Sequence, residues 1–117
     1  MRRGLTLTAL ILLAVLTTPT MVTAAYQVLE EWLYWDGSTS VDGETVDVLL
    51  ADDNTMLRVN FLSNSTVVPE DSCRDIDVYE FCFDDTSEEE NPDIDDEGQL
   101  RPGVKLVVSK YDITTKT

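Results

Sequence analysis

Three acidic side chains near the C-terminal end of the chain have the spacing of calcium ligands. In residues 91–100, NPDIDDEGQL, the side chains Asp93, Asp95 and Glu97 occupy every second position before a glycine. Calcium loops of this type place oxygen ligands at positions one, three and five, a glycine at six and a bidentate acid at twelve. Position twelve here is Val104, so the match is incomplete. The alternative is a solvated hairpin loop in a very acidic protein.

The chain offers little else that supports catalysis. It contains no histidine, so the usual proton shuttle and the usual activator of a serine or cysteine nucleophile are missing. The carboxylate pairs Asp52–Asp53 and Asp84–Asp85 lie in or beside predicted turns, where acids are normally solvated. A glycosidase needs two acids facing each other across a cleft, one of them desolvated. We therefore expect no enzymatic activity.

Two cysteines are the only thiols of the chain. Cys73 and Cys82 stand nine positions apart. Zinc sites usually combine four cysteines or histidines, and two thiols without histidine make a poor set. A disulfide between them is favoured over a metal site, because small exported domains often need such a cross-link.

One sequence motif marks a candidate modification site. Asn64-Ser65-Thr66 is an acceptor sequon for N-linked glycans, and it follows a predicted strand that ends near Leu62. We expect it to lie in a loop, either glycosylated at Asn64 or left as an unmodified polar turn.

The first 25 residues have the features of a secretory signal peptide. Arg2 and Arg3 precede an apolar core, Leu5 to Leu16, and small residues end the segment at Ala24 and Ala25. An uncleaved membrane anchor is the alternative, although the run TTPT at 17–20 interrupts the apolar stretch. The two arginines also fit a twin-arginine export signal. We then expect residues 26–117 to be a secreted, extracellular domain.

Removal of this segment makes the protein more acidic. Six of the 8 basic residues and all 23 acidic ones remain, so the net charge falls from −15 to −17. Such a chain repels nucleic acid and anionic lipid, so we expect no nucleic-acid partner and no membrane insertion after cleavage. Cations, basic proteins and uncharged molecules are compatible partners. Adaptation to high salt would give the same composition without any ligand.

The candidate residues lie among segments that predict β-strands. Apolar residues alternate with polar ones in four places, which is typical of strands with one buried face. These are Val46, Val48 and Leu50; Leu57, Val59 and Phe61; Tyr79, Phe81 and Phe83; and Val104, Leu106 and Val108. Asp42-Gly43 predicts a two-residue hairpin turn. The pattern predicts one all-β domain at 26–117, an antiparallel β-sandwich or partly open barrel of six to seven strands with one disulfide, and an acidic loop at about 84–101.

The aromatic segment Tyr26 to Trp35 (YQVLEEWLYW) predicts a first strand. Its side chains Trp32, Tyr34 and Trp35 form either a carbohydrate-binding platform or part of the core. In a domain this small the core is favoured, because large aromatic side chains supply much of the buried apolar area.

Three segments together resemble a known class of domain. GSTSVDGETVDVLLADDNTMLRVNF (37–61), SCRDIDVYEFCF (72–83) and GVKLVVS (103–109) are similar to the small β-rich domains of archaeal secreted and S-layer-associated cell-surface proteins. The resemblance implies a secreted or cell-surface structural or interaction module without catalytic residues, and without a cofactor unless calcium binds. Its partners would be other surface proteins, extracellular proteins or glycans. The alternative is a calcium-dependent ligand-binding domain that uses Asp93, Asp95 and Glu97.

Overall fold

A computed structural model describes residues 21–115 of the chain. The contacts divide the chain into two units, and the unit Ala25–Tyr111 contains the packed core. Positions 1–20 of the expected signal peptide lie outside the described residues. Its last five positions, 21–25, begin the first strand. No helix among the described residues has the length and apolar character needed to cross a membrane.

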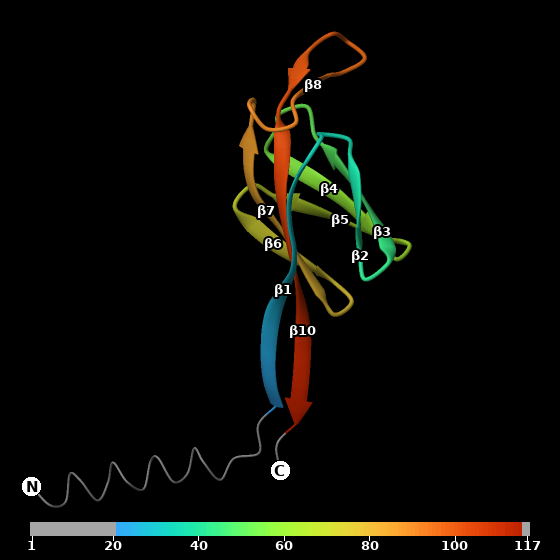
Figure 1. Cartoon of the computed structure of the whole chain (residues 1–117), viewed down its shortest axis with the longest axis vertical. Coiled ribbons are helices and arrows are strands. Elements are labelled where there is room, and N and C mark those ends of the chain that lie inside the picture. The colour runs from blue at the N-terminus through green and yellow to red at the C-terminus, as the bar shows by residue number, and fades with distance from the viewer. Residues whose placement is uncertain (1–20, 116–117) are drawn as a thin grey trace, which may run out of the picture. The chain divides into compact units, whose positions relative to one another are not determined.

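All regular structure described is β-strand (Figure 1). The strands are β1 (Met21–Leu33), β2 (Ser38–Val41), β3 (Glu44–Leu50), β4 (Met56–Phe61), β5 (Asn64–Pro69), β6 (Ser72–Ile76), β7 (Tyr79–Ser87), β8 (Asp93–Ile94), β9 (Leu100–Arg101) and β10 (Gly103–Thr115). One sheet has the order β1-β10-β7-β6 and a second has the order β2-β3-β4-β5. Strands β8 and β9 pair only with each other. The predicted all-β sandwich is confirmed, and the two sheets do not close into a barrel.

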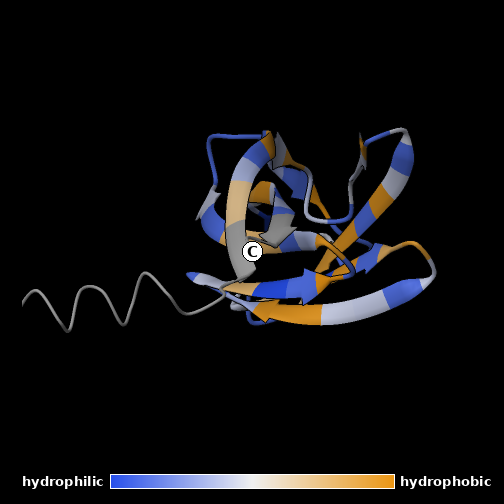
Figure 2. Cartoon of the chain, turned by 90° about the horizontal axis from the view of Figure 1, so that it is seen from below, coloured by the Kyte–Doolittle hydropathy of each residue, from blue (hydrophilic) through white to orange (hydrophobic). Residues whose placement is uncertain are grey.

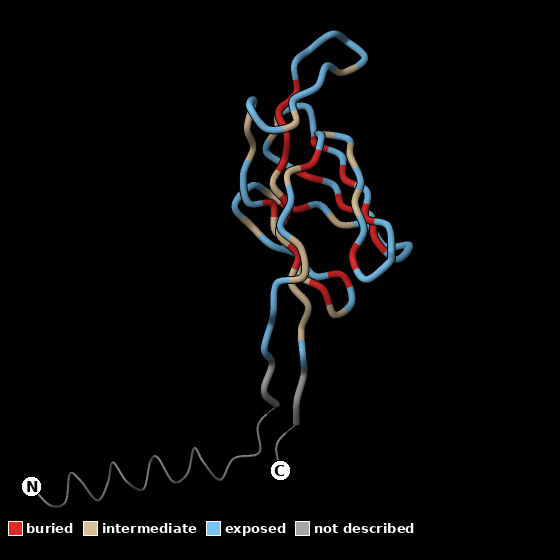
Figure 3. The backbone as a smooth tube through the Cα atoms, viewed as in Figure 1, coloured by how far each residue is buried: buried red, intermediate tan, exposed pale blue. Residues whose placement is uncertain are grey.

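The predicted alternation places one face of each strand in the core. Strands β3 and β4 are buried at every second residue, as the apolar positions required (Figure 3). Coloured by hydropathy, the strands likewise alternate between hydrophobic and hydrophilic segments (Figure 2). Phe61 connects the two sheets, with its ring centroid 5.1 Å from that of Tyr79 and 5.3 Å from that of Phe81. Side chains from both sheets therefore form one core.

Two-residue turns join several neighbouring strands. Asp42 and Gly43 have φ values of 50° and 81°, so the predicted primed turn between β2 and β3 is present. Leu62 and Ser63 also have positive φ, 51° and 63°, and connect β4 to β5. These two residues give almost no turn signal in the sequence. The hairpin they form was not predicted.

Three expectations need correction. The two sheets hold eight strands and the β8–β9 hairpin adds two, more than the six or seven expected, because short polar strands such as β2 and β6 lack a clear alternation. The acidic segment 84–101 is not one loop, since β7 continues to Ser87 and residues 93–94 pair with 100–101. The sequon begins strand β5 instead of lying in a loop.

The disulfide between Cys73 and Cys82 is present, as predicted. The two residues are direct cross-strand partners on β6 and β7, with Cα atoms 4.0 Å apart. Direct cross-strand partners are the nearest neighbours in an antiparallel ladder, so a disulfide can join them. The cross-link fixes β6, an edge strand, to the central strand β7.

Candidate functional site

Residues 91–101 form a short acidic hairpin that projects from the sandwich, here called the acidic hairpin (Figure 1). Its turn is closed by the backbone, since Asp95 N donates to Gln99 O at 2.9 Å and Gly98 N donates to Asp95 O at 3.0 Å. Gly98 has a φ of +78°, a conformation that favours glycine. The glycine of the proposed calcium motif is thus required by the turn itself.

The Asp95 side chain stabilises this turn from inside. Its Oδ1 atom accepts hydrogen bonds from the backbone amides of Glu97, at 3.0 Å, and Gln99, at 2.9 Å. The Gln99 amide is the main reason that the pKa of Asp95 is lowered from its ordinary value, with contributions from the Glu97 amide and from Arg101. Asp95 is therefore an ionised loop cap.

Arg101 anchors the hairpin to the sandwich. It is the one buried charged side chain among the described residues, with 3% of its surface exposed. Its Nη2 atom donates to the carbonyl oxygens of Leu50, at 2.9 Å, and Ala51, and its Nε atom donates to Asn54 Oδ1 at 3.2 Å. Those acceptors belong to the end of β3 and the β3–β4 turn. One guanidinium thus satisfies several polar groups at the end of the second sheet.

Two further contacts complete the environment of this guanidinium. Its Nη1 atom lies 3.6 Å from Asp95 Oδ2, and the group lies 4.8 Å from the centroid of the Trp35 ring. A second carboxylate, that of Asp52, lies 3.8 Å away but is fully exposed and contributes little. Trp35 is half-buried against the core, which supports the core interpretation for this residue. Tyr34 is 49% exposed, so the core interpretation is wrong for Tyr34.

The other end of the hairpin is also attached. Asn91 Nδ2 donates to the Trp32 carbonyl oxygen at 2.7 Å. After the hairpin, Gly103 packs so tightly that a Cβ atom there would lie 1.8 Å from Glu90 O. Only glycine fits at this position. Protein contacts on both sides therefore order the hairpin.

The hairpin exposes two large apolar side chains. Ile94 and Leu100 are cross-strand partners with 55% and 47% of their surfaces exposed. Direct partners on antiparallel strands point to the same side and lie close together. Exposed carboxylates at Asp93, Asp96 and Glu97 flank them. The hairpin thus presents an apolar pair surrounded by negative charge.

The three proposed calcium ligands are not gathered around one point. Asp93 Oδ1 accepts a hydrogen bond from the Ile94 amide at 2.8 Å, and Asp95 is engaged by two amides and Arg101. Among the described residues, the one group of three potential ligands with donor atoms within 4.8 Å is Cys73, Glu80 and Cys82. Asp93, Asp95 and Glu97 do not form such a group.

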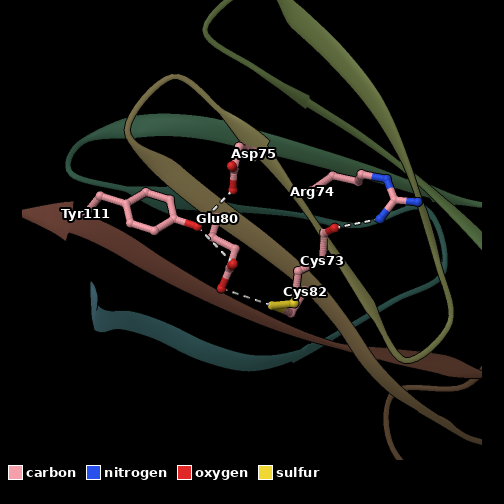
Figure 4. The surroundings of a disulfide bond; sticks show 6 residues. All are labelled: Cys73, Arg74, Asp75, Glu80, Cys82 and Tyr111. Carbon is pink, nitrogen blue, oxygen red and sulfur yellow. Dashed lines mark hydrogen bonds between the residues drawn. A yellow bond between two sulfur atoms is a disulfide. The ribbon is translucent and has the colours of Figure 1, made fainter. Parts of the chain in front are cut away.

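The group around the disulfide cannot hold a metal as it stands. Both sulfur atoms are bonded to each other, so no thiolate is present. Glu80 Oε1 lies 3.6 Å from Cys82 Sγ, but a disulfide sulfur has no proton to donate (Figure 4). The other Glu80 oxygen accepts a hydrogen bond from the Tyr111 hydroxyl at 2.9 Å. This hydrogen bond is the main cause of the raised pKa of Tyr111, which is about 12.

Calcium removal gives the first testable prediction. We expect the melting temperature of the protein to be the same in millimolar calcium and in chelator at moderate ionic strength, because protein groups already order the acidic hairpin. Magnesium at equal concentration controls for general screening. A rise in melting temperature specific to calcium would show that the carboxylates rearrange around the ion.

The sequon lies beside an open groove. Asn64 is exposed, and its Nδ2 atom donates to Leu62 O at 3.1 Å. A groove of about 580 Å³ separates residues 64–66 from the β6–β7 turn at 75–77. The structure thus leaves the acceptor nitrogen accessible at the start of an edge strand.

The acids of the two carboxylate pairs, Asp52–Asp53 and Asp84–Asp85, contact different groups. Asp84 Oδ2 lies 3.4 Å from Lys105 Nζ, while Asp53 Oδ1 accepts from the Thr55 amide at 3.1 Å. Asp52 lies in the β3–β4 turn beside Arg101. Asp53 and Asp84 therefore have separate local partners, and Asp85 Oδ1 accepts from the Thr86 amide at 2.8 Å.

Neither Arg101 nor the Ile94–Leu100 pair was predicted from the sequence. A signal existed, because Arg101 is the single basic residue in the acidic stretch from Asp75 to Pro102. Its burial and its acceptors depend on a turn about 50 positions earlier in the chain. Local patterns do not show such a contact.

Comparisons with protein families, curated proteins and solved structures give no match for this chain.

Proposed function

We propose that the protein is an exported interaction module of the cell surface, without catalytic activity, and that the acidic hairpin is its contact element. The observation that carries this proposal is the half-exposed pair Ile94 and Leu100 on an ordered, protruding hairpin. Apolar side chains displayed on a rigid element are typical of recognition sites.

The order of the hairpin supports a binding role. Arg101 and Asn91 hold it in place, so little conformational entropy is lost when a partner binds. Burying two aliphatic side chains contributes roughly 1.5 to 3 kcal/mol each at full burial. The surrounding carboxylates disfavour a contact surface that itself carries negative charge. The matching surface is an apolar recess bordered by positive charge.

Three features support an extracellular location. They are the signal-like segment at 1–25, the disulfide Cys73–Cys82, and the accessible sequon at Asn64, which we propose carries a glycan. The resemblance to S-layer-associated domains agrees with this placement. Other surface proteins are the proposed partners, and the proposed function requires no cofactor.

Binding of the mature protein to cell envelopes of its source tests the proposal. We expect the double variant Ile94→Ser with Leu100→Ser to bind at least about tenfold more weakly than the wild type, since tenfold corresponds to about 1.4 kcal/mol. The variant Leu62→Ser removes another exposed apolar side chain, 39% exposed, and should bind normally. Equal binding by the wild type and the double variant would exclude the hairpin as the contact element.

A further inference from the structure

The outer face of the second sheet carries an apolar patch, here called the β4 patch. Leu49, Met56 and Val67 expose 44%, 40% and 46% of their surfaces on strands β3, β4 and β5. With Ala51 and Arg58 they line a shallow hollow of about 250 Å³. The hollow is large enough to receive aliphatic side chains.

Arg58 lies in the middle of this patch. Its direct cross-strand partners are Leu49 on β3 and Val67 on β5. Arg101, Lys105 and Lys110 all pair with carboxylates, whereas Arg58 and Arg74 form no ion pair with any residue in the described part of the chain. Arg58 differs from Arg74 in that its neighbours Leu49 and Val67 are apolar. A fitting ligand combines aliphatic groups with a carboxylate.

The acidic hairpin has these properties. It presents Ile94 and Leu100 side by side, with exposed carboxylates next to them at Asp93 and Asp96. The hairpin is apolar with a negative border, and the β4 patch is apolar with a positive centre. The two surfaces are therefore complementary in hydrophobicity and in charge.

From this complementarity we infer that the β4 patch binds the acidic hairpin of a second copy of the same chain. This inference rests on the proposed function, because it keeps the hairpin as the contact element and names its partner. The two surfaces are different, so the contact is heterologous. Such contacts join copies into rings or open chains.

The charge of the protein predicts how this association depends on salt. Two copies of the mature protein, each with a net charge of −17, repel each other at low ionic strength. At about 1 M salt the screening length falls to about 3 Å, so only groups in direct contact still interact. Association should therefore increase with salt, the reverse of an interface that depends on long-range attraction.

Analytical ultracentrifugation of the mature protein in about 0.05 M and about 1 M NaCl tests the inference. The wild type is expected to be monomeric at low salt and to form larger species at high salt. The hairpin variant Ile94→Ser/Leu100→Ser and the patch variant Leu49→Ser/Val67→Ser should each remain monomeric. Leu62→Ser should associate like the wild type. All substituted residues are exposed, and a melting curve of each variant confirms that it folds.

Mixing the two variants is the decisive step. The hairpin variant keeps an intact patch and the patch variant keeps an intact hairpin, so an equimolar mixture should form a mixed dimer. A mixture of the hairpin variant with a third variant, Arg58→Glu, should also associate. Arg58→Glu keeps an intact hairpin, which the patch of the hairpin variant can bind. A mixture that stays monomeric would overturn the inference, as would a wild type that is monomeric at both salt concentrations. If hairpin-dependent binding to envelopes persists in those cases, the proposed function stands and only the identity of the partner is wrong.

Discussion

Replacing Arg101 by methionine is expected to lower the free energy of unfolding by about 3 to 5 kcal/mol, as measured by urea denaturation. Methionine preserves much of the aliphatic packing against Trp35 but carries no donors. The carbonyl oxygens of Leu50 and Ala51 would lose their hydrogen bonds, and Asp95 would lose its nearest counter-charge. Unpaired buried polar groups carry the full cost of desolvation.

Arg74→Met is the matched control for this prediction. Arg74 is exposed, and its only hydrogen bond within residues 21–115 is to the carbonyl oxygen of its neighbour Cys73, at 2.7 Å (Figure 4). Its replacement should change the unfolding free energy by no more than about 0.5 kcal/mol. Comparable losses for the two arginines would mean that Arg101 does not anchor the fold.

Removing the disulfide should produce the second large effect. The double variant Cys73→Ser/Cys82→Ser is expected to lose about 2 to 3 kcal/mol of unfolding free energy, because the open chain gains the entropy of a short loop in the unfolded state. The two residues are exposed and half-buried, so little packing is lost on replacement. Urea denaturation of the variant and of the oxidised wild type measures the difference.

Reduction supplies an independent check on the disulfide. Wild-type protein unfolded in urea with a reducing agent should match the double variant, whereas the variant should not respond to the reductant. An oxidised wild type no more stable than the variant would show that the β6–β7 hairpin does not need its cross-link.

Alternation predicted the core of this protein well. Residues such as Val48, Val59, Phe81 and Leu106 are buried where period-two patterning placed them, because a strand with one buried face must alternate. The disulfide followed from the cysteine count and the expected export. These features depend on local sequence and on composition.

The rest depended on contacts that local sequence does not encode. Leu62 and Ser63 adopt left-handed conformations without glycine or asparagine, so the polar run after Leu62 indicated a turn at 64–66 and not its actual position at 62–63. Arg101 is buried because a turn about 50 positions earlier offers it carbonyl acceptors. The regular spacing of Asp93, Asp95 and Glu97 is partly explained by the turn, in which Asp95 caps two amides.

Hydrogen exchange of the Glu97 and Gln99 amides tests most directly whether protein contacts alone order the acidic hairpin. In chelator, we expect these amides to exchange slowly in the wild type and fast in Arg101→Met, because Asp95 keeps both bonds only while Arg101 holds the hairpin. Added calcium should change neither rate. Fast exchange in the wild type that slows only when calcium is added would contradict the anchoring role of Arg101 and show that a metal ion orders the hairpin.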